Sequence, residues 1–156
     1  MALEGSGLGV WDWNLVTGGQ THSRHWEEML GYTEGSHTQG YRDFEDLVHP
    51  EDLPVVQAAA RAYMAGRTPE YSVDMRMRCS DGSWKWILAR GTVVERDPDG
   101  VPLRMIGTHT DISGRKRAEE VLQALNAELS ENSALLQTTL TSISQGILLF
   151  DADRRV

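Results

Sequence analysis

The sequence predicts an α+β fold, in which a five-stranded antiparallel sheet carries several short helices and is followed by one long C-terminal helix. Residues 71–112 contain three strand-like runs joined by two tight turns, and residues 9–22 contain two shorter runs of the same kind. Residues 115–143 lack proline and glycine and are rich in helix formers. The expected order is therefore two strands, short helices, three strands and a long helix.

The three later strands are predicted over residues 71–79, 83–95 and 101–112. The Asp-Gly pair at 81–82 favours a tight hairpin between the first two strands. The Asp-Pro-Asp-Gly run at 97–100 favours a turn between the last two, because proline fixes φ and glycine accepts a positive φ without steric cost. Together these residues form an antiparallel meander on which the other elements pack.

The elements before the meander are shorter. Residues 1–8 are predicted to be a loose lead-in, and residues 9–15 alternate in polarity, which is typical of a strand with Trp11 and Trp13 on one face. A second strand is expected near 20–22. Helices are expected over 23–30 with Ser23 as N-cap, over 42–48 presenting Phe44, Leu47 and Val48, and over 53–65.

Strand parity predicts which side chains could surround a ligand. The odd positions of the run 71–79 are apolar, whereas Asp74, Arg76 and Arg78 at even positions are charged. The apolar set should face the helices and line any cavity, and it comprises Tyr71, Val73, Met75 and Met77.

The C-terminal helix carries a second pattern. Apolar residues recur at alternating spacings of three and four, which predicts a coiled-coil seam over about three heptads. The seam consists of Leu122, Leu125, Leu129, Asn132 and Leu136, and it continues through Thr139 and Ile143. Asn132 would set the register and the oligomeric state. A helix of this length, roughly 45 Å, implies a partner helix and therefore a homodimer.

Composition restricts the classes of partner and compartment. The net charge of -8 argues against a nucleic-acid-binding surface. Cys79 is the single cysteine, so no intrachain disulfide can form and a reducing compartment is expected. No apolar run approaches the roughly 18–20 residues needed to cross a bilayer, and no signal peptide is recognisable. We therefore expect a cytoplasmic protein without direct membrane contact.

Several short motifs occur in a characteristic order. They are GVWDWNLVTG at 9–18, MLGYT at 29–33, HPED at 49–52, DGSWKW at 81–86, RDPDG at 96–100 and GTHTDISGRKRAEE at 107–120. This pattern resembles a PAS domain with its C-terminal PAC motif, of the type found in bacterial multi-PAS sensory proteins. The resemblance implies a PAS/PAC domain over 9–113, with the short helices on one sheet face, a coiled-coil signalling helix over 114–145, and the truncated first strand of a second PAS domain over 146–156.

The resemblance also assigns sheet faces and site residues. Ile87 and Ala89 would face inward beside His109, whereas Trp84 and Trp86 would lie on the outer sheet face. A cofactor-contacting side chain occupies the His109 position in flavin-binding relatives; the alternative is a hydrogen-bonded core histidine. Asp111 and Ser113 would cap the output helix and couple it to the sheet, although a plain cap would look the same in sequence. Gly107 and Asp111 share the inward parity of His109.

The sequence gives no positive sign of a cofactor or metal. Cys79 ends a strand and lacks the run that surrounds the reactive cysteine of flavin photoreceptors, which disfavours flavin. Residues 53–65 contain no histidine to ligate haem, and His49 fits a turn role instead. His22 and His25 lack a third ligand at metal spacing. The cofactor therefore stays unassigned and no metal is expected.

Enzyme motifs such as G-x-S-x-G, a P-loop or H-E-x-x-H are missing. The favoured hypothesis is a non-catalytic sensor and dimerisation module that detects a small-molecule ligand or a protein partner and signals through the C-terminal helix to an output domain, a histidine kinase. Alternatives are a diguanylate cyclase or phosphodiesterase output, and a structural dimerisation module without ligand. The expected homodimer would form through the C-terminal helix and the outer sheet face.

Overall fold

The computed structural model describes residues 7–36 and 41–153, and it divides into two compact units at Gly114. The first unit contains a sheet and short helices, and the second consists of helix alone.

The first unit is built on one five-stranded antiparallel sheet with the strand order β2-β1-β5-β4-β3. The strands are β1 (Gly9–Asn14), β2 (Gln20–His22), β3 (Tyr71–Arg78), β4 (Trp84–Arg96) and β5 (Pro102–Asp111). The meander β3-β4-β5 forms one half of the sheet, and the N-terminal hairpin β1-β2 joins it through β5. The predicted fold class is confirmed, with strand bounds within a few residues of the expected ones.

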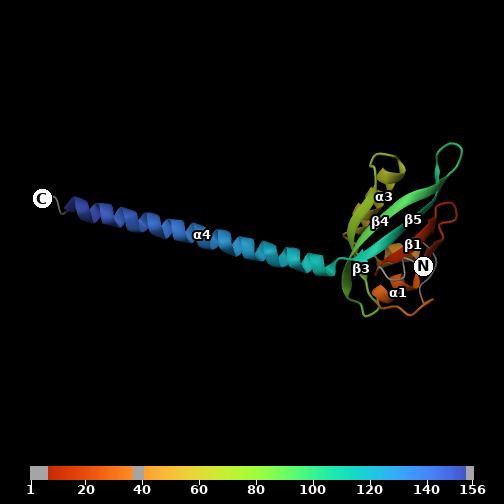
Figure 1. The fold of residues 1–156 in the computed structure, drawn as a ribbon, viewed down its shortest axis with the longest axis horizontal. Helices are drawn as coiled ribbons and strands as arrows, with labels where there is room; N and C mark the ends of the chain where they lie inside the picture. The colour runs from red at the N-terminus through yellow and green to blue at the C-terminus, as the bar shows by residue number, and fades with distance from the viewer. Residues whose placement is uncertain (1–6, 37–40, 154–156) are drawn as a thin grey trace. The chain divides into compact units, whose positions relative to one another are not determined.

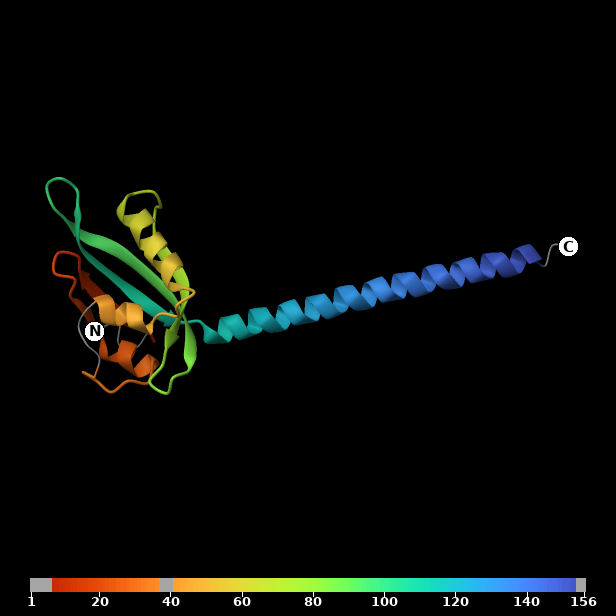
Figure 2. The same cartoon turned by 180° about the vertical axis from the view of Figure 1, so that it is seen from behind.

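Three short helices connect the two halves of the sheet: α1 (Arg24–Met29), α2 (Tyr41–Leu47) and α3 (Leu53–Met64). Figures 1 and 2 view the chain from opposite sides. The strands lie in front in Figure 1 and the short helices lie in front in Figure 2, so the helices cover one face of the sheet. Ser23 caps α1 as expected, because its hydroxyl accepts a hydrogen bond from the amide of Trp26.

The core lies between the helices and the inward sheet face. Its largest fully buried side chains come from both layers and are Trp26, Leu30, Val56, Met75, Met77, Ile87, Met105 and His109. Strand β3 alternates buried and exposed positions as its sequence alternates apolar and charged residues. Phe44, Leu47 and Val48, the apolar residues that the helix predicted over 42–48 was expected to present, are also buried.

Two paired glycines allow an aromatic ring to approach the sheet closely. Gly91 on β4 and Gly107 on β5 are register partners, and Gly107 is also the partner of Trp11 on β1. A Cβ atom at either glycine would overlap the Trp11 ring, and at Gly107 it would also overlap the carbonyl oxygen of Arg90. The glycines therefore make room for the indole inside the core.

The HPED segment protects the free edge of the sheet. The His49 amide donates to the carbonyl of Arg76 on β3, and the Arg76 amide donates to the carboxylate of Asp52. The Arg76 guanidinium donates hydrogen bonds to the carboxylates of Asp52 and Glu51. It holds the pKa of Asp52 below its ordinary value. The edge strand thus has its backbone groups satisfied at this position.

The second unit is the helix α4 (Ser113–Asp153), which begins within the first unit at Ser113. The strand expected over 146–156 is wrong for 146–153, which continue the helix, and 154–156 lie outside the described residues. Residues 147–149 are apolar enough for a strand but have no neighbouring strand to pair with, so the local preference of the leucines for helix prevails. Whether a second PAS domain follows stays a prediction.

Candidate functional site

The inward sheet face brings His109 into a cluster of aromatic rings. His109 is 2% exposed, and its ring centroid lies 6.0 Å from that of Trp11, 6.1 Å from that of Trp26 and 5.9 Å from that of Phe44. The Trp26 indole nitrogen donates to Nδ1 of His109 over 2.6 Å. Because tryptophan only donates, the imidazole is neutral and its proton is on Nε2. Burial lowers the pKa of His109 to about 3, with a further contribution from His22.

This bond joins the helical layer to the sheet. Trp26 belongs to α1, and its ring also stacks on His22 of β2 at a centroid distance of 3.8 Å. His109 belongs to β5, two residues before Asp111. The bond therefore connects α1 to the strand that leads to α4.

A small cavity lies beside this cluster, with a volume of about 20 Å³. Its lining comes from β1, β2, β3, β5, α2 and α3, and it comprises Trp11, Trp13, Gln20, Phe44, Ala60, Tyr71, Met105 and His109. A volume of this size admits roughly one water molecule. The interior as it stands does not fit a flavin or a haem.

The structure places all seven predicted pocket residues on the buried face, but in two roles. Tyr71 and His109 line the cavity. The other five fill the core without bordering the cavity, and they are Val73, Met75, Met77, Ile87 and Ala89. Gly107 lies beneath the Trp11 ring. Asp111, expected to point inward by parity, is partly exposed and pairs with Lys85 instead of lining the cavity.

Sequence reasoning missed six of the eight residues that line the cavity, and these are Trp11, Trp13, Gln20, Phe44, Ala60 and Met105. The available signals were the paired glycines at 91 and 107, which only become neighbours through strand pairing. Gln20 gave no signal, because a polar residue on a three-residue strand is ordinarily exposed.

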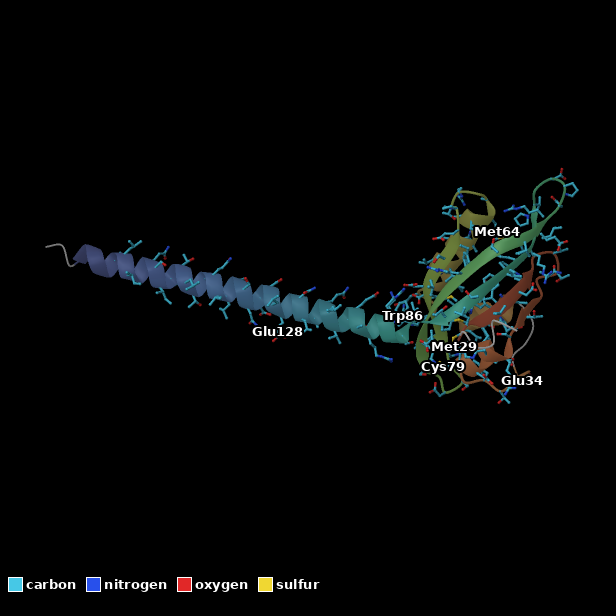
Figure 3. All side chains as sticks on the ribbon, viewed as in Figure 1. Met29, Glu34, Met64, Cys79, Trp86 and Glu128 are labelled. Carbon is cyan, nitrogen blue, oxygen red and sulfur yellow. The ribbon has the colours of Figure 1, made fainter. Side chains whose placement is uncertain are left out.

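The second part of the site is the junction between β5 and α4. The Ser113 amide donates to the Asp111 carboxylate at 2.9 Å, and the Trp86 amide donates to the Ser113 hydroxyl at 3.2 Å. The Ile112 amide donates to the Trp86 carbonyl. Figure 3 labels Trp86 on β4. Asp111 therefore accepts from the first amide of α4, whereas the Ser113 hydroxyl bonds to β4 and not to the helix.

Lys85 connects this cap to α1. Its ammonium donates to the carbonyl of Met29 at 2.7 Å and lies 3.3 Å from the Asp111 carboxylate. Burial by itself raises the pKa of Asp111, but the bonds from Ser113 and Lys85 outweigh it and leave the pKa below 3.8. Next to Lys85 is an open groove of about 300 Å³ whose lining includes Met29 and Cys79, both labelled in Figure 3.

The outer sheet face carries the tryptophans as expected. Trp84 is 43% exposed, and Trp86 is half-buried beneath the Arg76 guanidinium, whose carbon lies 5.4 Å from the ring centroid. In the second unit, the leucines of the predicted seam are exposed, from 54% at Leu125 to 69% at Leu129.

Among the described residues, no group of three or more histidine, cysteine, aspartate or glutamate side chains could hold a metal ion. Within the same part of the chain, no helix combines the length and the apolar character that a membrane span requires.

Comparison with curated proteins finds sensors among the relatives. The chain is 30% identical over 100 residues to the methyl sulfide methyltransferase-associated sensor of Methanosarcina acetivorans. The aligned residues make up 64% of this chain and 10% of that protein. It is 27% identical over 127 residues to the sensor protein FixL of Bradyrhizobium diazoefficiens, covering 81% of this chain and 25% of that protein. The chain thus spans between a tenth and a quarter of the length of these relatives.

Comparison with solved structures also finds sensory proteins. A sensory box histidine kinase/response regulator from Burkholderia thailandensis matches with a TM-score of 0.74 and 33% identity, over 83% of this chain and 95% of that one. The N-terminal domain of a diguanylate cyclase with a PAS/PAC sensor from Marinobacter aquaeolei matches with a TM-score of 0.61 and 29% identity, over 70% and 98% of the two chains. The model of the PAS fold family matches residues 21–109, from β2 through the buried histidine of β5. The chain therefore belongs to the PAS fold family.

Proposed function

We propose that the chain is a non-catalytic sensor and dimerisation module, in which events at the inward sheet face reach an output domain through α4. The PAS domain is a sensory module, and the relatives described above are sensors or sensory box proteins. The proposal goes further, because it assigns dimerisation to α4 and coupling to the junction at Asp111 and Ser113.

The observation that carries the proposal is the apolar seam of α4. Leucines exposed to water on a single helix do not stabilise it. Each leucine that is buried against a second helix contributes about 1.5–3 kcal/mol to the free energy of association. The alternating spacing of three and four is that of a left-handed two-helix coiled coil. A second copy of the same helix satisfies this pattern residue for residue, with Asn132 facing its counterpart.

The junction supports the coupling part of the proposal. Helix α4 begins at a cap whose acceptor is Asp111, and the same carboxylate is paired with Lys85, which also bonds to α1. Three elements of the sensor unit therefore meet where the helix starts. A small change in the angle of β5 or α1 alters this cap, and rigid helices carry such changes over long distances.

We propose a histidine kinase as the output domain, in a reducing, cytoplasmic setting. The similarity to the sensory box histidine kinase from Burkholderia thailandensis supports this choice. The similarity to the diguanylate cyclase sensor domain supports the alternative of a cyclase or phosphodiesterase output. A structural module without ligand is the third reading, which the closed interior favours. The outer sheet face around Trp84 would be a secondary dimer contact.

The experiment uses the double variant Leu125→Asp/Leu129→Asp in the full chain and measures the molar mass by light scattering. We expect the wild type at twice 17.4 kDa and the variant at 17.4 kDa, because two buried carboxylates per helix cost more than the seam can offset. The matched control is Gln123→Asp/Ala127→Asp, which adds the same charge at the same spacing on the other face of the helix and should remain dimeric.

An unchanged mass in the seam variant, or an equal loss of mass in the control, contradicts the assignment of the dimer contact. Far-ultraviolet circular dichroism of each variant separates loss of the dimer from loss of the sheet unit, because the sheet does not contain the altered residues.

A further inference from the structure

Two residues that line the cavity beside His109, Trp11 and Gln20, each have a buried polar side-chain atom that no described group satisfies. The indole nitrogen of Trp11 can only donate, and the side-chain oxygen of Gln20 can only accept. Both atoms are buried without a hydrogen-bond partner, and each residue is only 4% exposed. Both residues line the same cavity. A buried polar atom left without a partner costs about 1–3 kcal/mol, so an unsatisfied donor and an unsatisfied acceptor on two residues that line one cavity indicate a guest that bonds to both.

The size of the cavity limits the guest. A cavity must offer about 10–15 Å³ to hold a water molecule, and this one offers about 20 Å³. The space therefore admits one molecule of water size and no organic ligand. The Trp11 ring sets this limit, since it lies over Gly91 and Gly107 where a larger ligand would otherwise reach the sheet.

The charge of the lining limits the guest further. None of the eight lining residues has an ionised side chain: seven are apolar, aromatic or amide residues, and His109 is neutral because its Nδ1 accepts from Trp26. An ion in such a site would lose its hydration without a counter-charge. The guest must therefore be uncharged, and it must accept one hydrogen bond and donate another.

We propose that this cavity is a binding site for one uncharged, water-sized molecule, which accepts from Trp11 Nε1 and donates to Gln20 Oε1, with water as its resident occupant. The inference rests on the proposed function, because it assigns an occupant to the interior of the sensor unit. The occupant would lie against His109, two residues before Asp111 on β5. Its presence therefore stabilises the arrangement of β1, β2 and β5 around the strand that leads to α4.

The test is a nuclear magnetic resonance measurement on the full chain with water as the probe. A water-selected Overhauser experiment records transfer from the water resonance to the Trp11 indole proton, which the variant Trp11→Phe assigns. We expect a cross-peak in the wild type and its loss in Gln20→Met, which keeps the shape of the side chain but removes the acceptor. The matched control is Thr21→Val, an exposed position on the same strand, where the cross-peak should persist.

A crystal structure of the same protein supplies the second readout. We expect one density peak within hydrogen-bonding distance of both Trp11 Nε1 and Gln20 Oε1. A direct bond between these two side chains with the cavity closed, a dry cavity, or a larger organic molecule seen there and in the native mass spectrum would each overturn the inference.

The two proposals fail separately. If the cross-peak is absent while light scattering still gives a dimer that the seam variant breaks, the inference about the cavity is wrong and the proposed function stands. If the seam variant has no effect while the water is found, the reverse holds.

Discussion

The apolar residues inside the sheet unit are buried, whereas those on the surface of α4 are exposed. Met75 and Ile87 are completely buried between the sheet and the helices, whereas Leu129 on α4 is 69% exposed. The sheet unit satisfies its own apolar residues and needs no partner for its core. The helix has a regular apolar stripe that is exposed, and we propose that a second copy of the chain covers it. We therefore expect changes in the first unit to alter the free energy of unfolding, and changes in the apolar stripe of α4 to alter assembly.

The largest effect is expected from Gly107→Ala in the core. The new Cβ would overlap the carbonyl oxygen of Arg90 and the Trp11 ring, and neither the backbone of a paired strand nor a packed indole can move away freely. We expect a loss of about 3 kcal/mol or more in the free energy of unfolding, at the upper end for overpacking. Urea denaturation followed by tryptophan fluorescence measures it.

Gly114→Ala provides the control, because a Cβ there meets no atom within 4 Å. It should leave the free energy of unfolding unchanged or raise it by a few tenths of a kcal/mol, as alanine loses less chain entropy on folding than glycine. Equal losses in both variants would contradict the account of the core.

The second effect is expected from acid, and it accumulates gradually as the pH falls. The unfolded chain binds a proton at His109 near pH 6.5, whereas the folded chain binds it only near pH 3. Between these values the unfolded state holds more protons, so stability is complete above pH 6.5 and falls as the pH decreases. The slope approaches about 1.4 kcal/mol per pH unit.

His109→Gln retains an acceptor for Trp26 but does not titrate, so its stability should depend less on pH between 4 and 6.5 than that of the wild type. Asp12, Asp52 and Asp111 also have lowered pKa values, but their contribution is present above pH 3.8 and is lost only below it. Parallel curves for the two proteins above pH 4 would show that His109 is not the buried titrating group.

The smallest effect is expected at the junction. Asp111→Asn weakens the acceptor for the Ser113 amide and removes the partially exposed pair with Lys85, which together contribute about 0.5–1 kcal/mol. The free energy of unfolding should fall by that amount, and the Ser113 amide should exchange faster with deuterium. Asp99→Asn, in the exposed turn between β4 and β5, should change neither quantity.

Local pattern predicted most of the fold. The alternation along 71–79 identified the buried residues Tyr71, Val73, Met75 and Met77, and the turn sequences located β4 and β5. These features are encoded in residues that are close together in the sequence. The exception was 146–153, where an apolar run suggested a strand but the described residues offer no partner strand to stabilise it.

The cavity was less predictable, because it depends on distant residues. Trp11 can lie inside the core only because Gly91 and Gly107 become paired neighbours in the sheet, and Gln20 joins them through the pairing of β1 with β2. His109 was recognised as a residue of interest, but its bond to Trp26 depends on the position of α1 over the sheet. Periodicity within one element contains none of this information.

The most direct test of the central claim, that α4 pairs with its own copy through the leucine seam, is cross-linking by a single introduced cysteine. In a background with the native cysteine replaced, Cys79→Ala, the full chain carries Leu129→Cys on the seam or Ala127→Cys on the opposite face. After mild oxidation, the account predicts a disulfide-linked dimer for Leu129→Cys and little or none for Ala127→Cys. Equal cross-linking at both positions, or none at Leu129→Cys, would contradict it.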